Sequence, residues 1–129
     1  MTDIMLFGLA LAPLYAAIAQ VESDRGATSA NVYQIRDIYI KDVNQILTRP
    51  GWRYYPGFTV SDKFSKYKSE EMMKVYWAYW GLHYEDKTGK PVSYEVLARI
   101  HNGGPIGWKK PETVGYWNRV AAVMNGGVK

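Results

Sequence analysis

The chain has 129 residues, of which 47% are hydrophobic and 22% charged, a balance that is typical of a globular domain and excludes a disordered segment. It contains no cysteine, which excludes a disulfide-stapled scaffold and a thiolate metal site. The net charge of +4 suits an anionic partner such as nucleic acid, anionic lipid or bacterial cell wall, but no basic run selects among them. We expect a single domain over residues 1–129.

The first segment, from Ile4 to Ala19, is apolar enough to resemble a signal peptide or a membrane anchor. Asp3 stands where a signal peptide would carry positive charge, Gly8 and Pro13 interrupt the run, and the run is short for a membrane span. Apolar residues recur here at alternating three- and four-residue steps, which predicts a buried helix without membrane insertion, kinked or restarted at Pro13. The stripe consists of Ile4, Phe7, Leu11, Leu14, Ile18 and Val21.

The next part of the chain alternates between loops and one helix. Residues 27–35 are small and polar and then extended, so we expect a loop or a short β-hairpin. Asp37 can cap a helix that ends at Arg49-Pro50-Gly51. Residues 52–58 form an aromatic loop, which is a candidate wall or lid of a cleft, with packing over the core as the alternative.

Three helices are predicted in the second half of the chain. The first runs from Ser69 as N-cap to His83, and the second follows Ser93 and stops in the turn 101–105. The third opens at Pro111 or Thr113 and continues to Met124.

The last helix carries two adjacent aromatic residues, Tyr116 and Trp117, of which we expect Trp117 to be the core residue. The predicted fold is therefore mainly α, with a small hairpin or irregular segment at residues 27–35.

Glu22 is the most informative residue of the chain. It lies at the end of the very apolar first helix, just before a polar, turn-rich segment. Apolar surroundings and the negative end of a helix dipole both favour the protonated form of a carboxyl group. A carboxyl group that keeps its proton near neutral pH can act as the general acid that cleaves a glycosidic bond. A solvated surface glutamate is the ordinary alternative for such a position.

Four short motifs follow one another in a fixed order. They are Glu22-Ser23, Val32-Tyr33-Gln34-Ile35, Ala98-Arg99-Ile100-His101-Asn102-Gly103-Gly104-Pro105 and Thr113-Val114-Gly115-Tyr116-Trp117-Asn118-Arg119-Val120. The series resembles the lysozyme-like superfamily, especially its soluble lytic transglycosylase and goose-type lysozyme branch. The resemblance covers most of the chain. It implies a lysozyme-like α+β domain that cleaves the β-1,4 bond between N-acetylmuramic acid and N-acetylglucosamine in peptidoglycan.

The resemblance assigns roles to residues of the first two motifs. Glu22 looks like the catalytic acid that protonates the glycosidic oxygen. Ser23 looks like a residue that holds this carboxyl group or contacts sugar, and Tyr33 and Gln34 look like residues of the cleft wall. The family usually has a glycine shortly before Gln-Ile, whereas this chain has Asn31-Val32-Tyr33, so the segment is expected to be shaped differently.

The other two motifs supply further candidate substrate-binding residues. Asn102 matches the asparagine of the family's turn and would bind sugar or orient the cleft. Tyr116 matches the family tyrosine that lies near the acid. His101 replaces the tyrosine that usually precedes this asparagine, which changes the expected contacts with substrate.

A second catalytic carboxylate is not evident. Most glycosidases use two acids, and Asp24 and Asp37 are the candidates, although Asp37 fits helix capping better. Asp42 is expected on the outer face of its helix. The lytic transglycosylases that the pattern resembles use one glutamate, which favours that chemistry slightly over hydrolysis by a muramidase.

An alternative from another class is a non-enzymatic, basic helical domain that binds glycan or another polyanion, with Glu22 as a structural residue. We expect no cofactor and no metal, because His83 and His101 have no acidic or thiol neighbours at ligand spacing. The expected partner is the peptidoglycan glycan strand and not nucleic acid. The protein is expected to act as a monomer at an extracellular or periplasmic site.

Overall fold

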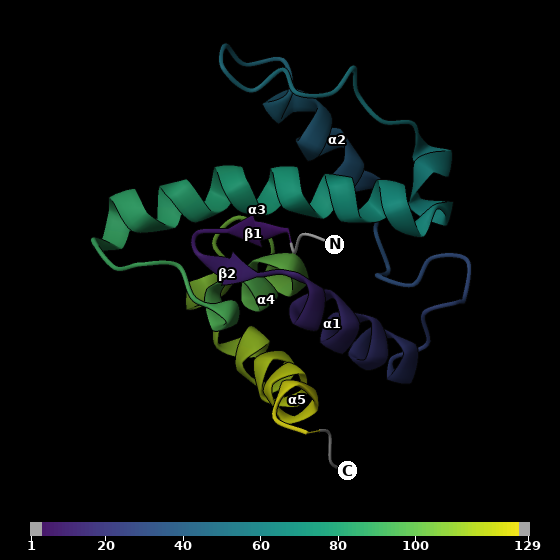
Figure 1. The fold of residues 1–129 in the computed structure, drawn as a ribbon, viewed down its shortest axis with the longest axis vertical. Helices are drawn as coiled ribbons and strands as arrows, with labels where there is room; N and C mark the ends of the chain where they lie inside the picture. The colour runs from purple at the N-terminus through teal and green to yellow at the C-terminus, as the bar shows by residue number, and fades with distance from the viewer. Residues whose placement is uncertain (1–3, 127–129) are drawn as a thin grey trace.

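The computed structural model describes residues 4–126, arranged around one long central helix. Figure 1 shows this helix, α3, with α2 on one side and with α1, α4 and α5 on the other. The helices are α1 (Ala12–Asp24), α2 (Asp37–Ile46), α3 (Lys66–Thr88), α4 (Tyr94–Gly103) and α5 (Val114–Met124). Together with one small antiparallel sheet they confirm the predicted mainly α architecture.

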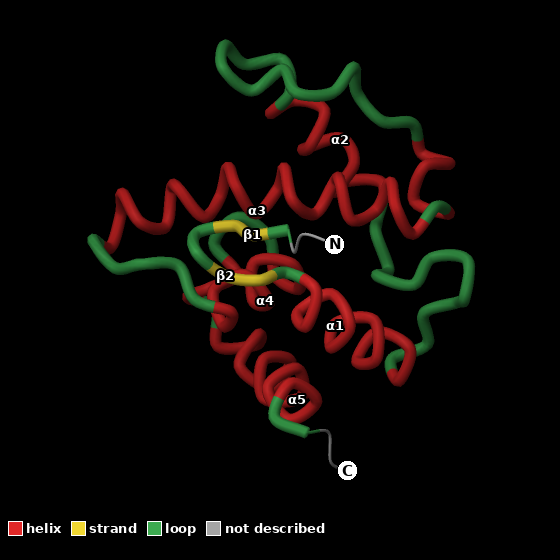
Figure 2. The backbone as a smooth tube through the Cα atoms, in the orientation of Figure 1, coloured by secondary structure: helices red, strands yellow, loops and turns green. Residues whose placement is uncertain are grey.

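The N-terminal segment differs from the predicted single helix. Strand β1 (Met5–Leu6) pairs with β2 (Leu9–Ala10) in a two-stranded antiparallel hairpin, drawn in yellow in Figure 2. The two turn residues, Phe7 and Gly8, have φ angles of 53° and 76°. Positive φ at both central positions is what a two-residue hairpin turn of type I′ requires, and Gly8 adopts it without steric cost.

Helix α1 begins only after this hairpin, and Pro13 lies in its first turn. Proline is tolerated there because the first N–H groups of a helix have no intrahelical acceptor. The predicted helix therefore forms only from Ala12 onward, and the part predicted before Pro13 is replaced by the hairpin. No helix within residues 4–126 is both long and apolar enough to span a membrane.

Residues 25–36 form an irregular segment between α1 and α2, without the β-hairpin that was the other possibility. Asn31 shapes its second half, because its side-chain oxygen accepts a hydrogen bond from the Ile35 amide at 2.9 Å and its side-chain nitrogen donates to the Ile35 carbonyl at 3.0 Å. Gln34 lies between Asn31 and Ile35 and has a φ of 53°, a left-handed conformation that is uncommon for a residue with a side chain.

Helix α3 is longer than the predicted 69–83. Ser65 is its N-cap and Gly89, with a φ of 69°, ends it. Ser69 is instead buried in the first turns. The predicted start of α4 is confirmed, because the Ser93 hydroxyl caps it. Helix α5 begins at Val114, directly after a short 3-10 turn.

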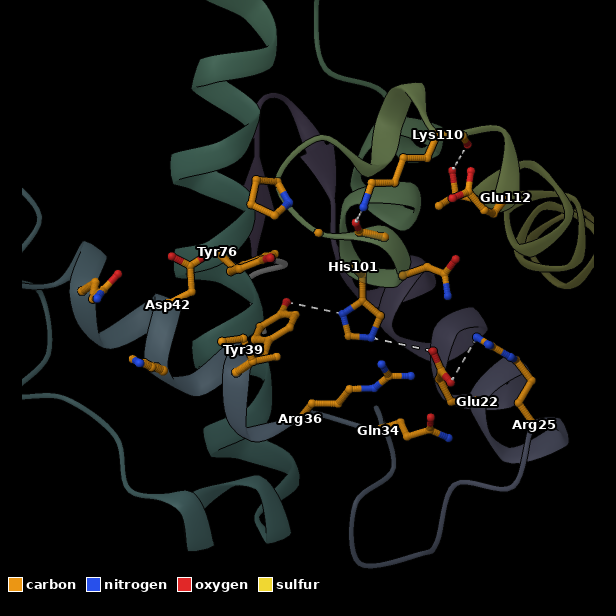
Figure 3. A pocket seen from close by; sticks show the side chains of 18 residues that line it. Glu22, Arg25, Gln34, Arg36, Tyr39, Asp42, Tyr76, His101, Lys110 and Glu112 are labelled. Carbon is orange, nitrogen blue, oxygen red and sulfur yellow. Dashed lines mark hydrogen bonds and ion pairs between the residues drawn. The ribbon is translucent and has the colours of Figure 1, made fainter.

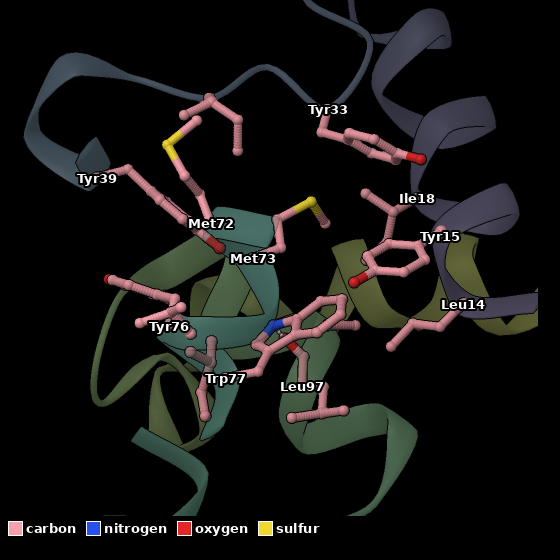
Figure 4. Packing of buried hydrophobic residues seen from close by; sticks show 14 of the residues in the cluster. Leu14, Tyr15, Ile18, Tyr33, Tyr39, Met72, Met73, Tyr76, Trp77 and Leu97 are labelled. Atoms are coloured by element: carbon pink, nitrogen blue, oxygen red, sulfur yellow. Dashed lines mark hydrogen bonds between the residues drawn. The ribbon is translucent and has the colours of Figure 1, made fainter. Parts of the chain in front are cut away.

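The buried side chains of these helices form one hydrophobic cluster, part of which Figure 4 shows. Trp77 of α3 lies at its centre with no exposed surface. Its indole nitrogen donates to the Leu97 carbonyl of α4 at 2.9 Å, and its ring stacks on Tyr15 of α1 with centroids 5.6 Å apart. The core thereby fixes α1 and α4, which carry the first and third sequence motifs, against the same helix.

Candidate active site

A pocket of about 770 Å³ lies where the end of α1, the irregular segment, α2 and α4 meet (Figure 3). Four of the predicted site residues, Glu22, Gln34, His101 and Asn102, line it. Charged residues that also line it are Arg25, Arg36, Lys41, Asp42, Lys110 and Glu112.

Glu22 is one of three carboxylic acids that line this pocket, and it is almost fully buried, with 3% of its surface exposed. Its Oε2 accepts a hydrogen bond of 2.7 Å from the Tyr116 hydroxyl. Its Oε1 is buried and has no hydrogen-bond partner among the described residues. The nearest cation is Arg25, whose Nη1 lies 3.7 Å from Oε1. One carboxyl oxygen is therefore held by the protein, whereas the other is available to a ligand.

Tyr116 reaches Glu22 from the other end of the chain. It is buried in α5, whereas Trp117 is only partly buried, so the expectation that Trp117 is the core residue of this pair was wrong. Burial, followed by the negative charge of Glu22, raises the pKa of Tyr116. The phenol therefore stays protonated near neutral pH and donates to the Glu22 carboxyl group.

The substitution Tyr116→Phe removes only this donor. We expect kcat to fall about tenfold or more, because a buried carboxyl oxygen without its donor costs about 1–3 kcal/mol and the acid loses its fixed orientation. Steady-state kinetics and thermal unfolding measure the two effects. An unchanged kcat would show that Glu22 does not depend on this hydrogen bond.

His101 is buried in α4, and the protein occupies both of its ring nitrogens. Its Nε2 lies 3.0 Å from the Tyr33 carbonyl oxygen, which can only accept, so this nitrogen carries the proton. Its Nδ1 then accepts from the Tyr39 hydroxyl at 3.3 Å. Glu22 Oε2 is 3.9 Å from Nε2. His101 therefore connects α4 with the irregular segment and with α2 at the pocket.

This histidine also supports Gln34. The carbonyl that His101 binds belongs to Tyr33, the residue immediately before Gln34 in the chain. Hydrogen bonds therefore fix the residues on both sides of Gln34 in the chain: His101 binds the Tyr33 carbonyl, and Asn31 binds the backbone of Ile35. Together they hold the left-handed backbone of Gln34. These contacts hold the Gln34 side chain at the pocket wall, where the sequence had placed it.

Burial lowers the pKa of His101. In the unfolded chain this histidine has its ordinary pKa of 6.5 and takes up a proton at a pH where the folded ring does not. His101 therefore lowers the free energy of unfolding as the pH falls below 6.5. We expect the wild-type melting temperature to fall more steeply than that of His101→Gln between pH 7.5 and 5, as measured by calorimetry. If the melting temperatures of the two proteins fall in parallel with pH, His101 is not the source of the pH dependence.

Other predicted residues do not reach the pocket. The side chain of Tyr33 points into the core, where its hydroxyl bonds to Glu70 at 2.5 Å, so the prediction that it forms the cleft wall was wrong. Ser23 and Asp24 are exposed beside Glu22 and do not line the pocket. Asp37 is also exposed and pairs with Lys63 at 2.9 Å.

Asp42 is the residue that sequence reasoning misplaced. It lines the pocket instead of lying on an outer face, and its carboxylate accepts a hydrogen bond from the Trp80 indole at 3.1 Å. Burial raises its pKa. The signal was a stripe of α2 residues at three- and four-residue steps, Ile38, Lys41 or Asp42, and Gln45, all of which line the pocket.

The aromatic loop 52–58 does not cover this pocket. Trp52, Tyr54 and Tyr55 line a separate apolar pocket of about 540 Å³ beside the N-terminal hairpin, and Phe58 packs into the core. The lid that the sequence suggested is therefore not formed. Residues 4–126 contain no group of three or more His, Asp or Glu side chains that could hold a metal ion.

No family model matches the chain. It is 35% identical over 102 residues to a lysozyme of Meretrix lusoria, covering 78% of this chain and 71% of that protein. It is 32% identical over 98 residues to invertebrate-type lysozyme 6 of Caenorhabditis elegans, covering 75% and 68%. The chain belongs to the invertebrate-type lysozyme family.

A solved structure agrees with this membership. A chain in the crystal structure of Aeromonas hydrophila PliI in complex with Meretrix lusoria lysozyme is similar with a TM-score of 0.62 and 28% identity, covering 87% of this chain and 88% of its own. The predicted lysozyme-like resemblance is thus confirmed at the level of the superfamily. These relatives are named lysozymes, and none of them is named a lytic transglycosylase or a goose-type lysozyme.

Proposed function

We propose that this protein cleaves the β-1,4 bond between N-acetylmuramic acid and N-acetylglucosamine in peptidoglycan, with Glu22 as the general acid. The observation that carries the proposal is the state of the Glu22 carboxyl group. It is buried at the pocket wall, Tyr116 holds one oxygen, and the other oxygen has no hydrogen-bond partner among the described residues. A buried polar atom without a partner is rare and points to a ligand.

The proposed reaction begins when the Glu22 carboxyl group donates its proton to the glycosidic oxygen and the bond to the leaving sugar breaks. The carboxylate that remains is stabilised by the Tyr116 hydroxyl and by Arg25, which lies 3.7 Å away. Glu22 then acts as a base and takes the proton of the attacking oxygen as that oxygen bonds to the anomeric carbon from which the leaving sugar departed. His101 stays neutral, because burial lowers its pKa and its Nδ1 accepts a hydrogen bond from the Tyr39 hydroxyl.

For the attacking group we favour water, and therefore hydrolysis, over the sugar's own 6-hydroxyl group. The relatives are named lysozymes, which supports this choice. Mass spectrometry of a digest of purified peptidoglycan separates the routes, because anhydro products are lighter by one water. A digest that contains only anhydro-muramic ends would contradict hydrolysis and indicate lytic transglycosylation.

The same digest tests the proposed activity against the alternative of a non-enzymatic glycan binder. An enzyme releases soluble fragments and lowers the turbidity of a cell-wall suspension with time. A binder pellets with the walls and releases nothing. We expect release of fragments without added cofactor, by a monomer that acts where peptidoglycan is accessible, at an extracellular or periplasmic site.

A further inference from the structure

Two arginine side chains lie in the pocket next to the acid. Arg25 follows α1 by one residue, and Arg36 precedes α2 by one residue, so they stand at the two ends of the irregular segment. Both line the pocket. Figure 3 shows the guanidinium groups of both side chains near Glu22, which lies between them.

Arg25 is only loosely engaged by the protein. Its Nη1 is 3.7 Å from Glu22 Oε1, beyond hydrogen-bonding distance, and its guanidinium carbon lies 5.2 Å from the centroid of the Tyr116 ring. The Tyr116 ring therefore packs against one face of the Arg25 guanidinium, while the N–H groups of Arg25 remain available to another acceptor.

Arg36 is not engaged at all. Its side chain forms no hydrogen bond or ion pair with any residue in the described part of the chain, although the pocket contains three carboxylates. Figure 3 shows it extending below the His101 ring toward Glu22, whereas Asp42 and Glu112 lie elsewhere around the pocket. Arg36 is exposed at the rim of the pocket, so its unpaired guanidinium group is accessible to an anion that comes with the substrate.

From this placement we infer that Arg36 and Arg25 form a subsite for a carboxylate carried by the glycan, next to the bond that Glu22 cleaves. This rests on the proposed function. A guanidinium group binds a carboxylate through two parallel hydrogen bonds, which gives orientation as well as affinity. The subsite would select glycan whose sugars carry acidic substituents over neutral chitin chains.

Peptidoglycan offers such a carboxylate in two forms. The lactyl group of N-acetylmuramic acid is a free acid when no peptide is attached. When a stem peptide is attached, the lactyl group becomes an amide and the peptide supplies the carboxylates. Polymers of N-acetylglucosamine alone have neither, although they share the β-1,4 backbone and the N-acetyl groups.

The experiment compares binding by Glu22→Gln and by the double variant Glu22→Gln, Arg36→Gln, so that no ligand is cleaved. Isothermal titration calorimetry is run with three probes: hexa-N-acetylglucosamine, a peptide-free oligomer of alternating N-acetylglucosamine and N-acetylmuramic acid, and the same oligomer with stem peptides. We expect the Arg36 substitution to weaken binding of an acidic probe about tenfold or more and to change binding of the neutral hexamer less than about twofold. The acidic probe that loses more affinity identifies the lactyl or the peptide carboxylate.

Lys87→Gln in the same background is the matched control, because Lys87 is an exposed cation on α3 outside the pocket. Added salt should weaken binding of the acidic probes and leave the neutral hexamer unaffected. Equal losses for all three probes, or none, would overturn the subsite. If wild-type protein cleaves peptidoglycan in that case, the proposed function stands and only this inference fails. Absence of cleavage by the wild type contradicts the proposed function independently of the binding data.

Discussion

The substitution Glu22→Gln should lower kcat on peptidoglycan by about 100- to 10,000-fold, the range that general acid–base catalysis contributes. Glutamine has nearly the same shape, and its amide oxygen can still accept the hydrogen bond from Tyr116, so the buried site should remain folded. What it lacks is a proton that can be transferred to the glycosidic oxygen. Initial rates of fragment release, together with circular dichroism and thermal unfolding, measure both properties.

The matched control for this variant is Asp24→Asn. Asp24 lies two residues further along the same helix, is exposed, and accepts a hydrogen bond from Gln20 at 3.2 Å. Its substitution also removes one negative charge, and it should leave kcat unchanged. Near-normal activity of Glu22→Gln would refute the proposed mechanism, and a loss of activity in Asp24→Asn would indicate that Asp24 takes part after all.

The substitution with the largest expected effect on stability is Trp77→Ala. It removes a fully buried indole, its hydrogen bond to the Leu97 carbonyl and its stacking on Tyr15. We expect the free energy of unfolding to fall by about 3–5 kcal/mol, a large share of the roughly 5–15 kcal/mol that stabilises a typical domain. Urea denaturation followed by far-ultraviolet circular dichroism measures it.

Trp117→Ala gives the comparison, because Trp117 is the partly buried tryptophan that the sequence suggested as core. Trp117→Ala should lower the free energy of unfolding by clearly less than Trp77→Ala does. If the two variants lose the same free energy, the position of Trp77 at the centre of the core does not determine its contribution.

The motifs of the sequence predicted part of the lining of the pocket. Glu22, Gln34, His101 and Asn102 all line the pocket, because short motifs preserve local geometry at helix ends and turns. The capping serine of α4 was also predictable, since a hydroxyl at that position satisfies free amide groups of the first turn.

Features that depend on packing between distant segments were not predictable. Residues 4–11 are almost uniformly apolar, and such a run is compatible with either a helix or a strand until the turn at Phe7 and Gly8 decides it. Asp42 faces the pocket only because α2 packs on α3, which brings the indole of Trp80 to its carboxylate. Tyr33 contributes its carbonyl oxygen to the site and its ring to the core, and a sequence pattern does not separate these two roles.

The hydrogen bond between Tyr116 and Glu22 joins residues 94 positions apart in the chain. The ribosome therefore makes the acid early and its hydroxyl donor only after most of the remaining fold has been synthesised. Until α5 docks against α1, the carboxyl group has no Tyr116 partner and is not oriented. The hydrogen bond that orients the Glu22 carboxyl group is thus completed only when the C-terminal helix is in place.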